Sequence, residues 1–105
     1  MSTNAWDMKA IITLYEKSNG GLHKPITLPY IGCLISVGSI NIDTRVYFER
    51  DLVLFPGDSA DVKLKFLNAE FASKYLHVGS EFGLVDYREF GRGKIVSVDV
   101  SDVTG

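Results

Sequence analysis

Two histidines and one cysteine are the side chains of this sequence best suited to metal or acid–base chemistry. His23 stands in a turn beside Lys24, and His77 lies far from it in the chain. A protein metal site needs three or four ligands with orienting partners, and neither histidine has neighbours at such a spacing. A catalytic histidine also needs a nucleophile or an orienting group within reach. We therefore expect both histidines to be structural or surface residues, and we expect no bound metal.

The remaining candidates for nucleophilic or phosphate-binding chemistry also favour simpler roles. Cys33 lies inside an apolar segment, where an inert buried thiol is expected rather than a nucleophile with a lowered pKa. Ser36 and Ser39 flank Gly38, but the Gly-x-Ser-x-Gly elbow of a serine hydrolase is absent. The Gly-Arg-Gly at 91–93 leads into a β-branched segment rather than a helix, so it predicts a turn and not a dinucleotide loop. These residues predict no enzyme and no cofactor.

The elements that carry these residues are short, apolar and separated by Gly, Ser, Asn, Asp or Pro. The clearest is "LFPGDSADVKLKF", in which a Pro-Gly-Asp turn precedes strict alternation of apolar and charged residues. Six strands are predicted in this way: Lys9–Tyr15, Ile31–Val37, Thr44–Glu49, Asp61–Leu67, Glu81–Asp86 and Lys94–Val100.

Many short strands without intervening helices indicate an all-β fold, which we expect to be a six-stranded antiparallel Greek-key barrel. A chain of 105 residues carries one domain, here 1–105 with its core at about 9–100. The segment "LNAEFASKYLH" (67–77) is interpreted as a long connection that can contain one helical turn. The first eight residues and the tail "SDVTG" are expected to fray.

Composition and charge narrow the class of partner. The net charge is −2 and the pI about 5.6, which is not the basic balance of a protein that holds nucleic acid mainly through phosphates. No segment has the pattern of a signal peptide or an apolar run long enough to span a membrane. With a single cysteine, a reducing cytoplasm is expected.

Three segments, "GGLHKPI", "LFPGDSADVKLKF" and "REFGRGKIVSV", resemble in order and spacing the C-terminal β-barrel (domain 3) of elongation factor Tu. The resemblance runs from about Ile11 to Val98. It implies a stand-alone barrel in which the matched residues are mostly scaffold positions. These positions are Gly20, Gly21, His23, Pro25, Pro56, Gly57, Asp58, Arg88, Gly91 and Gly93.

The chain departs from that family where the family's barrel faces tRNA. The family's Arg-Pro-Gln after a tyrosine is replaced by Ile-Gly-Cys after Tyr30, and its Glu-Gly-Gly loop is replaced by Val-Asp-Tyr before Arg88. The connection 68–79 is longer than the family's equivalent. No phosphate loop is present, so no GTP is expected.

These departures favour a non-enzymatic protein-binding module that presents new loops on a retained scaffold. Its setting would be that of an accessory factor that mimics the elongation factor, or of an immunity-type protein that occupies a toxin. The segments "LNAEFASKYLH" and "VDYREFGR" are the expected contact surfaces. The candidate contact residues are Tyr75, Tyr87, Arg88, Phe90 and Arg92.

The alternative is an RNA-binding module of the translation apparatus. Lys63, Lys65 and Lys94 would form its basic patch if the fourth and sixth strands lie close together. A solvated face is the competing interpretation, because outward lysines also guard strands against pairing with other sheets.

Overall fold

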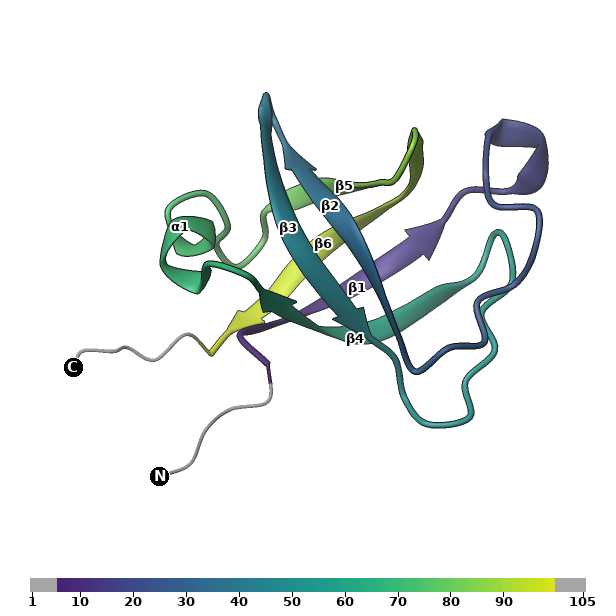
Figure 1. Cartoon of the computed structure of the whole chain (residues 1–105), viewed down its shortest axis with the longest axis horizontal. Helices are drawn as coiled ribbons and strands as arrows, with labels where there is room; N and C mark the ends of the chain where they lie inside the picture. Colours follow the sequence, from purple (N-terminus) through teal and green to yellow (C-terminus); the bar gives the residue numbers. More distant parts are fainter. Residues whose placement is uncertain (1–5, 100–105) are drawn as a thin grey trace.

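Six antiparallel strands form a closed barrel in the computed structural model, which describes residues 6–99 (Figure 1). The strands follow the order β1-β4-β3-β2-β5-β6 around the barrel, and β6 closes on β1. Their bounds are β1 Met8–Leu14, β2 Tyr30–Val37, β3 Ile40–Tyr47, β4 Ser59–Phe66, β5 Glu81–Val85 and β6 Glu89–Val98. Strands β2, β3 and β4 are consecutive neighbours, and β1 lies beside β4, which is a Greek-key arrangement.

Alternation of side chains decides which face of each strand is buried. In β4, Val62, Leu64 and Phe66 are buried, whereas Lys63 and Lys65 are exposed. Because successive side chains of a strand point to opposite faces, the apolar set fills the barrel and the lysines face solvent. The predicted all-β barrel and its strongest strand are therefore confirmed.

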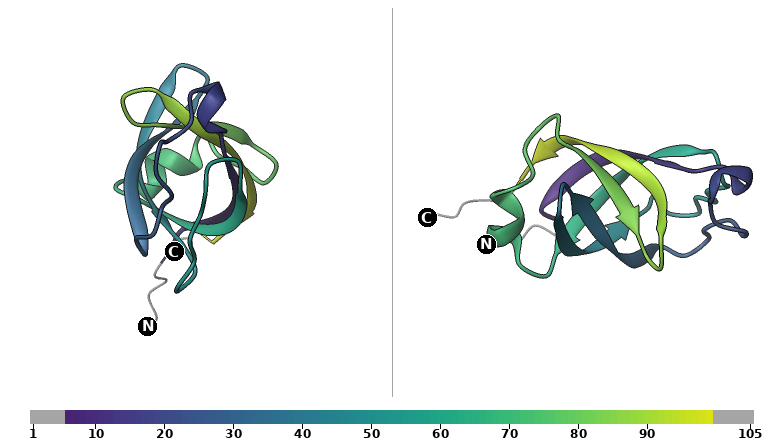
Figure 2. Two further views of the ribbon diagram at one scale, coloured as in Figure 1. Left: turned by 90° about the vertical axis from the view of Figure 1, so that its right-hand side faces the viewer. Right: turned by 90° about the horizontal axis from the view of Figure 1, so that it is seen from above.

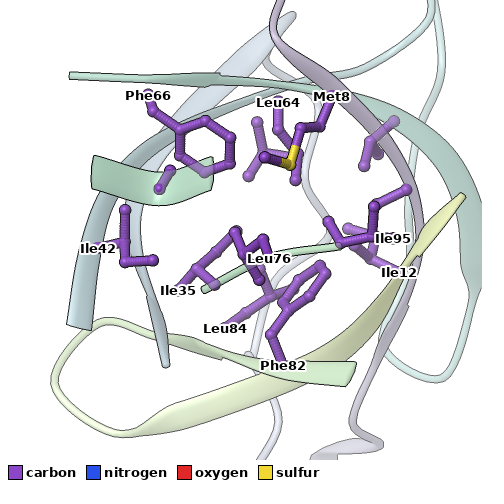
Figure 3. Close-up of a cluster of buried hydrophobic side chains, with 14 of the residues drawn as sticks. Met8, Ile12, Ile35, Ile42, Leu64, Phe66, Leu76, Phe82, Leu84 and Ile95 are labelled. Carbon is purple, nitrogen blue, oxygen red and sulfur yellow. The ribbon is translucent and has the colours of Figure 1, made fainter. Parts of the chain in front are cut away.

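A short helix closes one end of the barrel. Helix α1 (Ala69–Ser73) starts at Asn68, whose Oδ1 accepts a hydrogen bond of 3.0 Å from the backbone N–H of Phe71. Ala72 and the following Leu76 are fully buried. Figure 3 shows Leu76 beside Ile35 among the side chains of the core, and the right view of Figure 2 shows α1 at one end of the barrel. The helical turn expected in this connection is confirmed, and its apolar side plugs the barrel.

Two glycines allow close packing inside the barrel wall. A Cβ on Gly93 would lie 2.4 Å from Cζ of Phe82 and 3.0 Å from the backbone oxygen of Ile11. A Cβ on Gly91 would lie 2.9 Å from the oxygen of Thr13. These residues lie within β6, so the Gly-Arg-Gly segment is part of a strand and not the turn that the sequence suggested.

Two strands begin several residues before their predicted starts. Strand β3 begins at Ile40, because the hairpin turn is tight and uses only Gly38 and Ser39. Strand β6 begins at Glu89 and pairs with β5 from its first residue. The predicted end of that strand, Val100, lies outside the described residues.

The expectation that the first eight residues fray is wrong for the last three of them. Met8 is fully buried and opens β1. The backbone oxygen of Asp7 accepts a hydrogen bond from the backbone N–H of Asp99. The carboxylate of Asp7 accepts a second hydrogen bond, of 3.0 Å, from the backbone N–H of Phe66. Trp6 donates its indole N–H to Asp99 at 3.3 Å. These bonds hold this part of the chain against β4 and the end of β6.

The substitution Gly93→Ala should lower the free energy of unfolding by about 1 to 3 kcal/mol, because the new methyl group overlaps the ring of Phe82. Urea denaturation measures the change. The matched control is Gly32→Ala in β2, where an added Cβ has no heavy atom within 4 Å and should change stability by less than about 0.5 kcal/mol. Equal effects of the two substitutions would contradict this account of β6.

Candidate functional site

The tip of the β5–β6 hairpin presents an exposed tyrosine beside an arginine. Tyr87 is 99% exposed and Arg88 is exposed. The turn is closed by a 3.0 Å bond from the N–H of Asp86 to the oxygen of Arg88. At its base the hydroxyl of Tyr15 donates a hydrogen bond to the carboxylate of Glu89. That bond is the main reason that the pKa of Tyr15 is raised. Thus two side chains typical of protein interfaces stand on an anchored turn.

Phe90 and Arg92 differ in their placement. Arg92 is exposed on β6. Phe90 is only 4% exposed and belongs to the core, so its assignment to a contact surface is wrong for this structure. The error came from placing it in a connection; as the second residue of β6 it points inward, on the face opposite Glu89.

The connection between β4 and β5 exposes a group of apolar side chains around α1. The rings of Phe71 and Tyr75 pack with centroids 5.2 Å apart. Leu67 is 84% exposed and Val78 is 67% exposed. We call these four residues, Leu67, Phe71, Tyr75 and Val78, the helix patch. They lie on the solvent side of the segment whose other side plugs the barrel.

The two predicted contact segments do not form one surface. Helix α1 precedes β5 and the hairpin tip follows it, so the helix patch and Tyr87 lie toward opposite ends of that strand (Figure 1). Of the five candidate contact residues, Tyr75 belongs to one surface and Tyr87 and Arg88 to the other, whereas Arg92 pairs with Gly83 in the middle of β5. The sequence could not show this separation, because it depends on where the chain enters and leaves β5.

The three lysines of the predicted basic patch are also divided. Lys63 and Lys65 face outward from β4, but β1 lies between β4 and β6. Lys94 pairs in register with Ile11 on one side and with Glu81 on the other. The predicted patch required the fourth and sixth strands to lie close together, and β1 separates them.

A different group of cations gathers where β4 meets β1 and β3. Lys9, Lys63, Tyr47 and Tyr30 occupy one row across four adjacent strands, by the registers Lys9↔Lys63, Lys63↔Tyr47 and Tyr47↔Tyr30. The ammonium of Lys63 lies 4.0 Å from the centroid of the Trp6 ring, and that of Lys9 lies 5.8 Å from it. Both distances are within the range of cation–π attraction.

The second row of this surface adds an arginine. Arg45 pairs in register with Lys65, and its guanidinium carbon lies 5.7 Å from the centroid of the Tyr30 ring. The rings of Tyr30 and Tyr47 have centroids 5.2 Å apart. We call the two rows together with the indole the cation–aromatic face; it consists of Trp6, Lys9, Tyr30, Arg45, Tyr47, Lys63 and Lys65. Alternation in "INIDTRVY" could have placed Arg45 outward, but its neighbours come from the register of distant strands.

A shallow depression of about 750 Å³ adjoins this face. Gly32 lies in its lining, and Asp43, Arg45, Lys65 and Asp86 bring charges of both signs to it. Mixed charge around an open depression suits recognition of polar groups.

Cys33 is an unreactive thiol in this environment. It is partly buried against the core, opposite Thr44 of β3. Burial raises its pKa to about 12, and the nearby carboxylate of Asp86 adds to the increase. The expected inert thiol thus has a physical cause. Both histidines are exposed, and no three His, Cys, Asp or Glu residues within 6–99 are grouped closely enough to hold a metal ion.

Comparison with known proteins identifies no family. No protein-family model matches the sequence, and no curated protein matches it. Within residues 6–99, no helix has both the length and the apolar character needed to cross a bilayer.

The raised pKa of Cys33 predicts slow alkylation of the folded protein. At pH 8 the thiolate fraction should be roughly a thousandfold smaller than that of an ordinary thiol of pKa 9.0, so iodoacetamide should react correspondingly slowly until urea unfolds the chain. Mass spectrometry against time measures the two rates. Asp86→Asn should change the folded rate little, because burial is the larger cause.

The same shift predicts a loss of stability at high pH. The folded state keeps the thiol proton that the unfolded state releases, so this contribution is complete below pH 9 and is lost as the pH rises toward 12. Cys33→Ala should remove that part of the loss in urea titrations at several pH values. A variant with an unchanged alkaline decline would contradict the assignment to Cys33.

Proposed function

We propose that this barrel is a non-enzymatic binding module of the cytoplasm whose partner is a protein. The observation that carries the proposal is the helix patch, in which Leu67 (84% exposed) and Val78 (67% exposed) belong to the same connection as the packed rings of Phe71 and Tyr75. Leaving apolar side chains in water forgoes about 25 cal/mol per Å² of the area that a partner could cover. Exposed apolar groups gathered on one element mark interaction surfaces.

The hairpin tip is a second contact point of the same kind. Tyr87 and Arg88 are residue types enriched where protein interfaces bind most strongly. The turn that carries them is fixed by its own backbone bond and by the contact of Tyr15 with Glu89. A fixed turn loses little conformational entropy when a partner binds.

We also propose that the barrel is a stand-alone relative of domain 3 of elongation factor Tu. The residues that match the family's motifs have structural roles that such a barrel needs. Gly57 has φ of 92° in the turn before β4. A Cβ on Gly21 would lie 2.0 Å from the backbone oxygen of Tyr15. An accessory factor that mimics the elongation factor, or an immunity-type protein that occupies a toxin, would both use a rigid barrel with altered loops.

The proposal is tested by affinity capture from the native lysate with and without ribonuclease. A stoichiometric protein should bind the tagged chain after ribonuclease treatment. The double variant Leu67→Ser, Val78→Ser should weaken its binding about tenfold or more while leaving the thermal transition nearly unchanged, because both side chains are exposed.

The control is Val53→Ser, which removes an exposed apolar side chain from the connection between β3 and β4. A second variant, Tyr87→Ala with Arg88→Ala, tests the hairpin tip separately. Unchanged binding by both the helix-patch and hairpin variants would sink the assignment of these surfaces.

The second candidate function is RNA binding through the cation–aromatic face. The specific observation in its favour is the alternation of rings and cations, with Lys63 4.0 Å from the Trp6 ring and Arg45 5.7 Å from the Tyr30 ring. Single strands bind to surfaces of this kind through stacking on aromatic rings and neutralisation of phosphates. This face lies outside the residues expected from the sequence, except for Lys63 and Lys65.

For the RNA candidate, binding of a fluorescein-labelled single-stranded RNA should weaken steeply as salt is added. The double variant Lys63→Ala, Lys65→Ala should reduce the slope of log affinity against log salt by about 1.4, since each phosphate contact contributes about 0.7. Lys94→Ala, two strands away, is the matched control. Quenching of Trp6 fluorescence gives a second readout, and equal slopes for the two variants would exclude this face.

A further inference from the structure

One stretch of β2 has a partner strand on only one side. Strand β2 pairs with β3 along its whole length, from Tyr30↔Tyr47 to Val37↔Ile40. On its other side it pairs with β5 at only three positions, and the last of these is Leu34↔Val85. After Val85 the chain turns away into the β5–β6 hairpin. The first residues of β2 therefore form an open edge within an otherwise closed barrel.

The hydrogen bonds show which backbone groups point toward this open side. Just before β2, the backbone oxygen of Pro29 accepts a 2.8 Å hydrogen bond from the backbone N–H of Phe48. At the other end of the β2–β3 hairpin, Val37 pairs with Ile40 across the two-residue turn. Along a strand in an antiparallel sheet, residues whose backbone groups hydrogen-bond to the neighbouring strand on one side alternate with residues whose backbone groups point to the other side. Odd-numbered residues of β2 thus bond to β3, and the backbone groups of Tyr30 and Gly32 point away from it.

Those groups have no partner within the described part of the chain. Within residues 6–99 no turn, loop or side-chain hydrogen bond involves the backbone of Tyr30 or Gly32, and the ladder with β5 ends at Leu34↔Val85. Both residues are exposed. Two donors and two acceptors therefore stand in a row at the spacing of a sheet ladder.

The surroundings of the open edge leave room for another strand. Gly32 has no side chain to block the approach, and a Cβ placed there would meet nothing within 4 Å. Gly32 lines the depression of about 750 Å³ described above, together with Val85 and Asp86. Ile31 lines a second depression of about 440 Å³, whose other lining residues include Leu22, Pro25 and Leu28.

We propose that the open edge of Tyr30 and Gly32 binds an extended segment of a partner protein, which adds as a strand to β2. The segment pairs antiparallel, exchanging backbone bonds with Tyr30 and Gly32. Its residue opposite Ile31 carries an aliphatic side chain into the depression beside Ile31, and its residue opposite Gly32 carries a large ring over the glycine. The inference deepens the proposed function by naming the form of the partner, and it requires that the partner be a protein.

A second copy of this chain fits the open edge less well than a foreign segment. Antiparallel pairing of two such edges about a twofold axis places Ile31 opposite Ile31. The side chain of Ile31 packs against the core of its own barrel, so it cannot fill the depression of the other copy. The occupant is therefore a segment whose aliphatic side chain is free to enter.

The first test is amide hydrogen exchange by NMR on the full chain. In the free protein the amides of Tyr30 and Gly32 should exchange rapidly, while those of Ile31 and Cys33, bonded to β3, are protected. Adding the peptide acetyl-Glu-Thr-Phe-Val-Thr-Glu-amide, designed with Phe opposite Gly32 and Val opposite Ile31, should slow exchange at Tyr30 and Gly32. The same peptide N-methylated at Phe and at the following Thr should have no such effect. Protection of Gly32 in the free protein, or equal binding of both peptides, would overturn the proposal.

Two substitutions at one position provide the matched comparison. Gly32→Pro removes the backbone N–H that the open edge would donate to the peptide, but it breaks no hydrogen bond between β2 and β3. It should therefore weaken peptide binding at least tenfold. Gly32→Ala keeps the donor and should bind within a few fold of the parent chain. Sedimentation velocity tests whether a second copy of this chain binds the open edge instead. A concentration-dependent dimer that is lost in Gly32→Pro would show that the occupant is a second copy and not a partner segment.

The outcomes also separate this inference from the proposed function. Suppose that the captured protein no longer binds the helix-patch variant but still binds Gly32→Pro. The open edge is then not its binding site, and the proposed protein-binding function stands. If the peptide binds at the open edge but no protein is captured from the lysate, the inferred site stands without its proposed biological role.

Discussion

The two-sided pairing of β1 is the constraint on which the rest of the structure depends. Its hydrogen bonds to β4 on one side and β6 on the other turn a six-stranded sheet into a closed wall. Closure hides the sheet edges and creates a narrow interior, which side chains must fill completely. The demand for close packing explains the glycine at position 93 against Phe82, and it explains why Leu76 is used to plug the end of the barrel.

Unequal strand lengths determine where the closed wall is incomplete. Strand β2 has eight residues and β5 has five, so the seam between them ends before β2 does. Because β5 ends at Val85, the chain leaves β2 there, and the next residues form a hairpin tip on which Tyr87 is exposed to solvent. The open edge and the exposed hairpin tip are thus two results of one short strand. The helix patch has a separate origin, since it is the outer side of the segment that plugs the opposite end.

Local patterns allowed most of the fold to be predicted, whereas the surfaces needed information that only the assembled barrel contains. Alternation at Val62, Leu64 and Phe66 predicted β4 correctly, because burial of one strand face leaves a period of two in the sequence. Phe90 was misplaced because the glycines after it resemble a turn, although they serve packing within β6. The row from Lys9 to Tyr30 depends on registers between strands far apart in the chain, which no local pattern encodes.

The pairing of Met8 with Val98 also has a consequence for the order of events during synthesis. Of the six strands of the barrel, β1 is synthesised before both of its partners, with β4 following three strands later and β6 after that. Until then, the inward side chains of Ile12 and Leu14 have no partner strand to cover them. Native contacts between such distant residues form slowly, since a long loop must close before they are gained. Between the synthesis of β1 and that of its two partner strands the apolar face of β1 is uncovered, and a chaperone that binds such strands would act on β1.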